Sequence, residues 1–236
     1  MSIGYGTSIV RDGLVLHLDT ANVKSYPGSG TVWKDLSGNG NDFNIVGADY
    51  ITSPSPHFSL IDNQGDYVVR STSDVVGGLD DFSFDMCMRI DSFSATLCTF
   101  ISYATVTNNN AILFGRNGNG RLAMWLAASN FDTAVGPTDS DYNIGEFIHF
   151  VLTRSGTNVK VYINGELKSD NNSYFNGLVE TGGTLVFGQE QDSPEGGFST
   201  GQDFPGDFAS IKVYGSTLTE SEVKQNFEAL RGRYGI

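Results

Sequence analysis

The feature that most restricts how this chain can fold is a long succession of short apolar runs separated by turns. Residues 14–19 point alternately to two sides, which is the period-2 pattern of a strand. Asn164-Gly165 is typical of the tight turns that join antiparallel strands. The chain also contains 29 glycines, which tight turns use because glycine accepts positive φ. Together these features predict an all-β sandwich.

The predicted strands are short apolar segments with turn residues between them. They cover residues 14–19, 67–70, 82–90, 97–105, 111–114, 122–127, 147–154, 159–163, 185–187 and 208–214, with one more around Val179. No internal repeat, linker or low-complexity segment interrupts the series. We therefore expect one domain over residues 11–236, preceded by an N-terminal arm over residues 1–10.

One helix is predicted near the C-terminus, over residues 220–231. Thr219 and Glu222 have the spacing of a capping box at its start. Val223, Phe227 and Leu230 share one face of such a helix. Gly232 is expected to end the helix. The apolar face should pack on the sandwich and close one edge of it.

The overall charge restricts the partners. The formal net charge of −13 argues against nucleic acid and against an anionic membrane, since neither attracts an acidic surface. No stretch approaches the ~18 consecutive apolar residues that a membrane span needs. The N-terminus lacks the basic start and apolar core of a secretory signal. We expect a protein made in a reducing cytoplasm.

Two cysteines, Cys87 and Cys98, are too few for a disulfide framework. A hairpin turning near Ser92 would allow them to face each other. The preferred interpretation is a reduced, buried pair.

A cluster of oxygen-bearing side chains follows the strand at 185–187. Residues 189–192 are Gln, Glu, Gln and Asp, and after a glycine-rich loop come Gln202 and Asp203. Crowded carboxylates repel each other unless a cation lies between them. Carboxylate and amide oxygens are ligands of hard cations such as Ca²⁺. The sequence therefore predicts a candidate metal site in this loop.

An enzyme is the alternative interpretation of the same loop. Glu190, Asp192 and Glu195 have the spacing of the carboxylates of retaining glucanases, which need two carboxyls about 5 Å apart. However, Pro194 would interrupt the strand that must carry them. There is also no tryptophan nearby to hold a glucan. We therefore expect no enzymatic activity.

A second Asx-rich turn, at residues 35–46, matches only the first half of a helix-loop-helix calcium loop. Its twelfth position is Val46, where a bidentate glutamate is required. We predict a simple turn there.

Residues 185–223, which begin LVFGQEQDS, resemble the segment of the pentraxins that runs from the calcium loop to the C-terminal strand. Residues 100–113 and 84–87 are similar to two further pentraxin segments. The resemblance implies a two-sheet antiparallel jelly-roll sandwich of the concanavalin A-like type, with calcium held on one face and bridging to a phosphate monoester or a sugar. The ligand positions that it implies are Asn109, Asn110, Glu190, Gln191 (by its backbone carbonyl), Asp192 and Gln202.

Two positions depart from the pentraxin pattern. Asn109 and Ser199 stand where pentraxins have acidic residues. Since ligand charge tunes calcium affinity, we expect weak binding of at most one Ca²⁺ ion. Cys87 corresponds to the first cysteine of the pentraxin disulfide. The second cysteine of that disulfide corresponds to His149. The family's disulfide is therefore absent.

Residues 13–43 and 208–236 are similar to laminin-G-like domains common in bacteriophage virion proteins. This resemblance implies an accessory virion protein (head decoration, neck or tail appendage), made in the host cytoplasm and assembled with other virion subunits. The arm would then order against a neighbouring subunit through Ile3, Tyr5, Ile9 and Val10. A non-catalytic virion structural protein is the preferred prediction. The alternatives are a calcium-dependent carbohydrate-binding lectin and, after it, a glucanase-type glycoside hydrolase.

Overall fold

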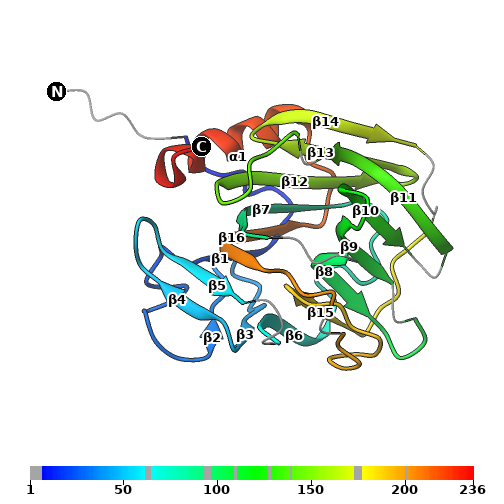
Figure 1. The fold of residues 1–236 in the computed structure, drawn as a ribbon, viewed down its shortest axis with the longest axis horizontal. Helices are drawn as coiled ribbons and strands as arrows, with labels where there is room; N and C mark the ends of the chain where they lie inside the picture. The colour runs from blue at the N-terminus through cyan, green and yellow to red at the C-terminus, as the bar shows by residue number, and fades with distance from the viewer. Residues whose placement is uncertain are drawn as a thin grey trace.

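The computed structural model describes residues 7–61, 65–92, 97–108, 111–126, 129–138, 140–172, 177–199 and 201–236. Within these residues the chain forms two antiparallel sheets of eight strands each and one helix near the C-terminus. The sheets pack face to face, and the helix lies against the outside of one of them (Figure 1). The predicted all-β jelly-roll sandwich with one C-terminal helix is confirmed.

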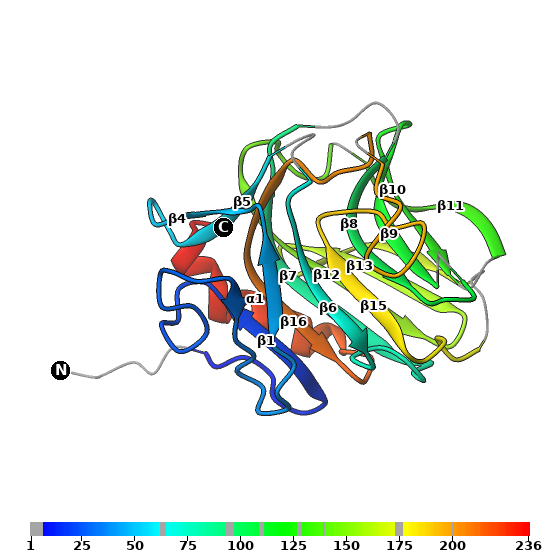
Figure 2. The same cartoon turned by 90° about the horizontal axis from the view of Figure 1, so that it is seen from below.

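Sheet A has the order β14-β13-β12-β7-β16-β5-β4, with β1 also paired to β16 (Figure 2). Its strands are β1 (Leu14–Asp19), β4 (Asp49–Ile51), β5 (His57–Leu60), β7 (Phe82–Ile90), β12 (Phe147–Ser155), β13 (Asn158–Ile163), β14 (Glu166–Asn171) and β16 (Gly206–Tyr214). Sheet B has the order β11-β10-β9-β8-β15-β6-β3-β2. Its strands are β2 (Val32–Trp33), β3 (Phe43–Val46), β6 (Tyr67–Ser73), β8 (Leu97–Ala104), β9 (Ile112–Asn117), β10 (Arg121–Leu126), β11 (Ser129–Thr138) and β15 (Gly183–Phe187).

Aromatic side chains from both sheets fill the space between them. Phe100 of β8 and Phe114 of β9 contact Phe150 of β12, with ring centroids 6.2 and 5.3 Å apart. All three side chains are fully buried. Each such ring removes roughly 150–250 Å² from water, so these contacts across the layers account for much of the cohesion of the sandwich.

The predicted strands lie within one to three residues of the observed ones, with one exception. The strand expected around Val179 is absent, so that prediction is wrong. Val179 is instead buried in an irregular segment, where its N–H donates to the carbonyl of Leu79 and its carbonyl accepts from Gly78. The burial of Val179 explains why this position is apolar. Its hydrogen-bond partners, Gly78 and Leu79, lie in an irregular segment and not in a strand.

Helix α1 (Glu220–Tyr234) begins at the predicted capping box, in which Thr219 and Glu222 bond reciprocally. It does not end at Gly232: the left-handed C-cap is Gly235. The last turn is held by Tyr234, whose ring lies 5.5 Å from that of Phe147. The helix also covers the outer face of central strands of sheet A, in contact with β12, and does not close an edge as expected.

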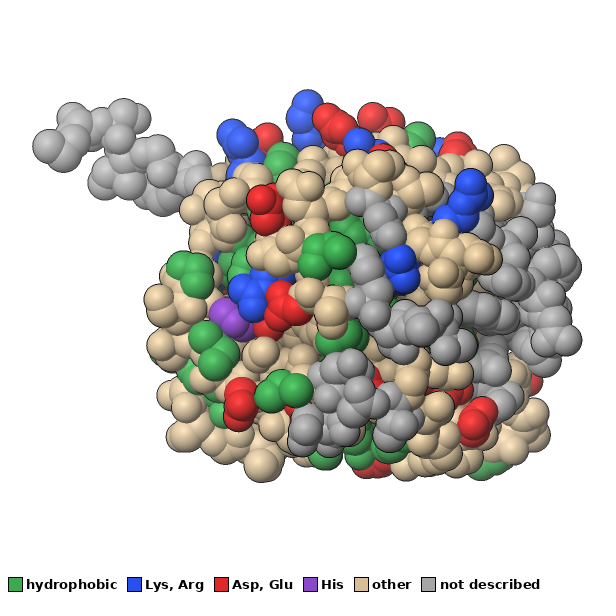
Figure 3. Space-filling view, viewed as in Figure 1, with side chains coloured by type: hydrophobic (Ala, Val, Ile, Leu, Met, Phe, Trp, Pro, Cys, Tyr) green, Lys and Arg blue, Asp and Glu red, His purple; other side chains and the backbone are tan. Residues whose placement is uncertain are grey.

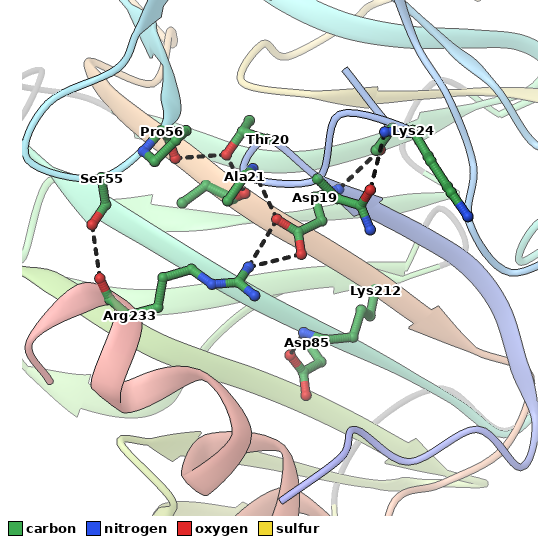
Figure 4. A network of polar contacts seen from close by, with 12 residues as sticks. Asp19, Thr20, Ala21, Lys24, Ser55, Pro56, Asp85, Lys212 and Arg233 are labelled. Atoms are coloured by element: carbon green, nitrogen blue, oxygen red, sulfur yellow. Dashed lines mark hydrogen bonds and ion pairs between the residues drawn. The ribbon is translucent and has the colours of Figure 1, made fainter. Parts of the chain in front are cut away.

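A salt bridge at the end of α1 ties the helix to β1. Arg233 Nη1 lies 3.0 and 2.8 Å from the two carboxylate oxygens of Asp19 (Figure 4). Ser55 Oγ, from the segment before β5, donates to the Arg233 carbonyl. These contacts add to the reasons for the helix continuing past Gly232.

The end of the N-terminal arm packs on its own domain. The Val10 N–H donates to Asn226 Oδ1 (2.8 Å), and the Val10 carbonyl accepts from the Tyr214 hydroxyl (3.1 Å). Val10 is buried beside Val223 of α1. The prediction that Val10 contacts a neighbouring subunit is therefore wrong, and Ile3 and Tyr5 lie outside the described residues.

Both cysteines are buried, as predicted, and the structure forms no disulfide between them. Cys87 is in β7 of sheet A and Cys98 is in β8 of sheet B. In the register of β7 and β12, Cys87 lies directly opposite His149. His149, the residue that the pentraxin resemblance places at the position of the missing disulfide partner, is thus a direct cross-strand neighbour of Cys87.

Among the described residues, no helix has the length and apolar character that crossing a bilayer requires. On the face shown in Figure 3, acidic and basic side chains are interspersed. The net charge of −13 is therefore not gathered into a single patch there.

Candidate functional site

The loop at residues 188–203 follows β15 and is attached to β8 (gold to orange in Figure 1). At its start, the Gly188 N–H donates to the carbonyl of Phe100 (3.1 Å). Near its end, the Thr99 N–H donates to the carbonyl of Gln202 (3.1 Å). Gly188 has φ +95°, and a Cβ there would lie 2.2 Å from Leu60 Cδ2. Only glycine fits at this position, so the chain leaves the strand on a fixed path.

The side chain of Gln191 is a structural anchor beneath the loop. Its Nε2 donates to the carbonyls of Ser102 (3.1 Å) and Thr184 (2.9 Å), and its Oε1 accepts from the Glu195 N–H (2.9 Å). The side chain is fully buried. These three hydrogen bonds hold the side chain beneath the loop, and the pentraxin resemblance implies that Gln191 offers a cation its backbone carbonyl.

A second buried amide positions the neighbouring carboxylate. Gln189 Nε2 donates to Asp203 Oδ1 (3.1 Å), and Gln189 Oε1 accepts from the Glu190 N–H (3.0 Å). The ligand set carried over from the pentraxins contains neither Gln189 nor Asp203. The oxygen cluster predicted from the sequence does contain both residues, but their role in supporting Glu190 depends on contacts that the sequence does not show.

Glu190 is the chemically unusual residue of the loop. It is only 4% exposed, and among the described residues its Oε2 has no hydrogen-bond partner. Burial, together with the negative charge of Asp192, raises the pKa of Glu190 to about 7. A buried carboxylate oxygen without a donor is costly unless a cation satisfies it. This observation fits a hard cation held between Glu190 and Asp192.

Asp192 lies at the exposed tip of the loop. Its N–H donates to the carbonyl of Gly196 (3.0 Å), and a Cβ at Gly197 would lie 2.6 Å from Asp192 Cβ. The two glycines thus fold the return of the loop tightly against Asp192. A cation bound here would lie near the surface, with room for a further ligand.

The predicted calcium-ligand set stays a prediction, because these contacts show where some of its residues lie but not that they bind an ion. Glu190, Gln191 and Asp192 lie in one turn, and Gln202 lies at the far end of the loop. Asn109 and Asn110 fall outside the described residues. In the part of the chain that is described, no three His, Cys, Asp or Glu side chains are spaced to hold a metal. An ion at this site would therefore take most of its ligands from amide, carbonyl and water oxygens.

The three carboxylates of the glucanase alternative do not lie on one strand face. Strand β15 ends at Phe187, so Glu190, Asp192 and Glu195 all lie in the loop. Glu195 has a left-handed backbone (φ +53°), and its Oε2 accepts from Ser71 Oγ on β6. The strand alternation that would pair two carboxyls for retaining hydrolysis is absent here.

A two-sheet jelly roll with an oxygen-rich loop on one sheet is the architecture of a lectin-like domain. Comparison with known proteins agrees: residues 62–224 match the family described as the concanavalin A-like lectin/glucanases superfamily, under the name Laminin_G_3. The chain belongs to this family.

Individual relatives include pentraxins. C-reactive protein of Rattus norvegicus is 25% identical over 147 residues, which is 60% of each chain. The chain thus spans about 60% of the length of that relative. The resemblance to pentraxins that the sequence suggested is confirmed.

Two solved structures share the fold. Domain 4 of AbnA, a GH43 extracellular arabinanase from Geobacillus stearothermophilus, in complex with arabinotriose, has a TM-score of 0.66 at 17% identity and covers 90% of this chain and 97% of its own. The heptameric SAP-like pentraxin of Limulus polyphemus has a TM-score of 0.58 at 21% identity, with 70% of this chain and 78% of its own covered.

Proposed function

We propose that the chain is a non-catalytic glycan-binding module whose loop at residues 188–203 holds one Ca²⁺ ion. The observation that carries this proposal is the buried Oε2 of Glu190, which has no hydrogen-bond partner in the described part of the chain and lies near a second carboxylate, Asp192. Bound calcium supplies a positive centre to which the hydroxyl groups of a sugar can coordinate.

The residues that would hold the ion are those implied by the pentraxin resemblance, and the geometry defines what some of them offer. Glu190 contributes the free Oε2, Asp192 its carboxylate, and Gln191 its carbonyl. Asn109, Asn110 and Gln202 complete the proposed set. Because residues 109 and 199 lack the acidic groups of the pentraxins, one weakly bound ion is expected.

Support for the glycan comes from the fold. The domain of the arabinanase that covers most of this chain is described in complex with arabinotriose. This supports an oligosaccharide as the class of ligand. The absence of a strand-borne carboxylate pair in the loop supports binding without hydrolysis.

The test is thermal unfolding in calcium and in chelator. A ligand that binds only the native state raises the free energy of unfolding by RT ln(1 + [L]/Kd). Millimolar calcium should therefore raise the midpoint temperature of unfolding. Glu190→Gln should abolish this rise. Glu195→Gln is the matched control, because Glu195 bonds to Ser71 and has no assigned ligand role. Identical unfolding of the wild type in calcium and in chelator would refute the calcium site.

A second proposal concerns where the module works: we propose that it is an accessory component displayed on a phage particle, assembled with other virion subunits. The two segments that resemble virion domains, residues 13–43 and 208–236, support it because they form one unit. Strand β1 pairs with β16 in the register His17 with Lys212, and α1 follows directly. Mass spectrometry of purified particles tests this proposal, and absence of the chain from them would refute it.

A further inference from the structure

A cluster of buried polar groups lies between α1 and the outer face of sheet A, away from the loop at 188–203. Lys212 of β16, Asp85 of β7 and Asn226 of α1 are each 0% exposed. Lys212 and Asp85 are directly opposite each other in the strand register. Figure 4 shows their side chains next to each other, with α1 to one side of them in this view. Burying a lysine, an aspartate and an asparagine together has a large desolvation cost. The proposed glycan binding does not involve these three residues.

One carboxylate joins the other two groups. Lys212 Nζ lies 2.6 Å from Asp85 Oδ1, and Asn226 Nδ2 donates to Asp85 Oδ2 (2.7 Å). Asp85 thus holds a primary amine and a carboxamide on its two oxygens. Burial opposes ionisation of Asp85, but the charge of Lys212 outweighs it and holds the pKa of Asp85 below its ordinary value. The resting state is therefore an ammonium–carboxylate pair.

The carboxamide of Asn226 is also fixed at its other end. Its Oδ1 accepts from the Val10 N–H (2.8 Å), and its Nδ2 also donates to the Tyr214 hydroxyl (2.9 Å). A backbone N–H on the carbonyl oxygen stabilises the negative charge that develops there during attack on the carbon. A carboxylate at the amide nitrogen can deliver a proton to it as it leaves.

The surroundings are apolar and exclude water. The side chains of Val151, Tyr162 and Val223 form a buried cluster at this interface. Four titratable groups among the described residues also border the cluster. His149 is fully buried, and its Nε2 lies 3.1 Å from Asp85 Oδ1. His17 lies opposite Lys212 in the register of β1 and β16, the buried Cys87 interacts with Lys212 and Asp85, and the Tyr214 hydroxyl accepts from Asn226. In such a medium, transfer of a proton along the 2.6 Å contact from Lys212 to Asp85 removes both charges, which lowers the cost of desolvation.

The geometry points to an intramolecular amide bond between Lys212 Nζ and Asn226 Cγ, formed with Asp85 as the proton-transfer group. Asp85 accepts a proton from Lys212, and the free amine attacks Cγ. Asp85 then moves a proton from Nζ to Nδ2, the Cγ–Nδ2 bond breaks, and ammonia leaves with the remaining proton as ammonium. No oxidant or reductant is needed, because an ammonium group and a carboxamide become a secondary amide and ammonium.

The bond would join the last strand to the helix that covers it. Strand β16 and α1 are otherwise held together by side-chain packing and hydrogen bonds. A covalent link at this point would prevent the helix from separating from sheet A. This inference is independent of calcium and glycan binding.

A second cluster of a lysine, an aspartate and an asparagine serves as a comparison for the buried one. On the surface, Asp170 accepts from Asn158 Nδ2 (2.6 Å) and lies 3.4 Å from Lys160 Nζ. The same three residue types thus meet again, but the Lys160 side chain is 35% exposed. Because water solvates that ion pair, transferring a proton between its two groups gives no saving in desolvation. Only the buried set should react.

The test is the intact mass of the full wild-type chain, measured under denaturing conditions. The expected mass is that of the sequence less one molecule of ammonia. Trypsin should fail to cleave after Lys212 and should release residues 169–224 joined to residues 225–231. Asn226→Ala should show the full mass of its own sequence, whereas Asn158→Ala should keep the deficit.

Two results would overturn the inference. The first is a wild-type chain with the full mass of its sequence, which would leave the cluster as a hydrogen-bonded ion pair. The second is an ammonia deficit that maps to a cyclic imide at an Asn-Gly pair such as Asn164-Gly165, with no linked peptide. Both results come from the wild-type protein, so neither depends on the folding of a variant.

Discussion

Replacement of Glu190 by glutamine should stabilise the calcium-free protein at alkaline pH. The pKa of this buried carboxyl rises from 4.5 in the unfolded chain to about 7 in the folded one. Between these values the folded state binds more protons than the unfolded state, so stability falls as the pH rises. At about 1.4 kcal/mol per pKa unit, the loss by pH 8 is roughly 3 kcal/mol as an upper value. Glutamine keeps the shape and removes the charge.

The assay is urea unfolding in chelator at pH 5 and pH 8. At pH 5 the wild-type carboxyl is mostly protonated in the folded state, so wild type and Glu190→Gln should have similar stability. At pH 8 the free energy of unfolding of the variant should exceed that of the wild type by up to roughly 3 kcal/mol. Glu195→Gln should follow the wild type at both pH values. A Glu190→Gln variant that is less stable than wild type at pH 8 in chelator would refute the reasoning.

The remaining predictions concern the loop anchor, the helix, the cysteines and catalysis. Gly188→Ala should destabilise the protein by roughly 2–4 kcal/mol in urea unfolding, because its Cβ would clash with Leu60 in a left-handed backbone. A chain truncated after Tyr214 should aggregate, because it exposes the surface under α1; a soluble truncation with wild-type unfolding would contradict this. Cys87 and Cys98 should react with a thiol reagent only on unfolding, since both are buried and burial raises the pKa of Cys87. Assays on β-glucans should detect no hydrolysis.

The sandwich was predictable because strands with one buried face carry a period-2 pattern in the sequence. Strand β14 (Glu166–Asn171) was missed because it is an edge strand with mostly exposed, polar residues. Strand β2 (Val32–Trp33) has only two residues, which is too short for any periodicity. These two strands form because neighbouring strands and turns hold them in place, and the residues within each strand do not show this.

The end of helix α1 and the position of the N-terminal arm also depend on residues far away in the sequence. The capping box at Thr219 fixed the start of α1, because capping is a local interaction. Its end is set by the distant partners Phe147 and Asp19, so the glycine at 232 did not stop it. Val10 is ordered by Asn226, which is 216 residues away in the sequence.

The residues of the candidate site could be predicted from the sequence, but their burial and the hydrogen bonds that anchor them could not. The spacing of residues 189–192 indicated oxygen ligands, and the resemblance to pentraxins indicated calcium. The burial of Glu190, the anchoring of Gln191 by Ser102 and Thr184, and the support from Asp203 depend on how the loop meets β8 and β15. No sequence pattern contains these contacts.

The most direct test of calcium-dependent glycan binding is a glycan array probed with the wild-type protein, once in millimolar calcium and once in chelator. We expect the wild type to bind an oligosaccharide in calcium and to lose this binding in chelator. Glu190→Gln should not bind, while Glu195→Gln should bind as the wild type does. Glycan binding that is unchanged in chelator, or binding that Glu190→Gln retains in full, would contradict this expectation.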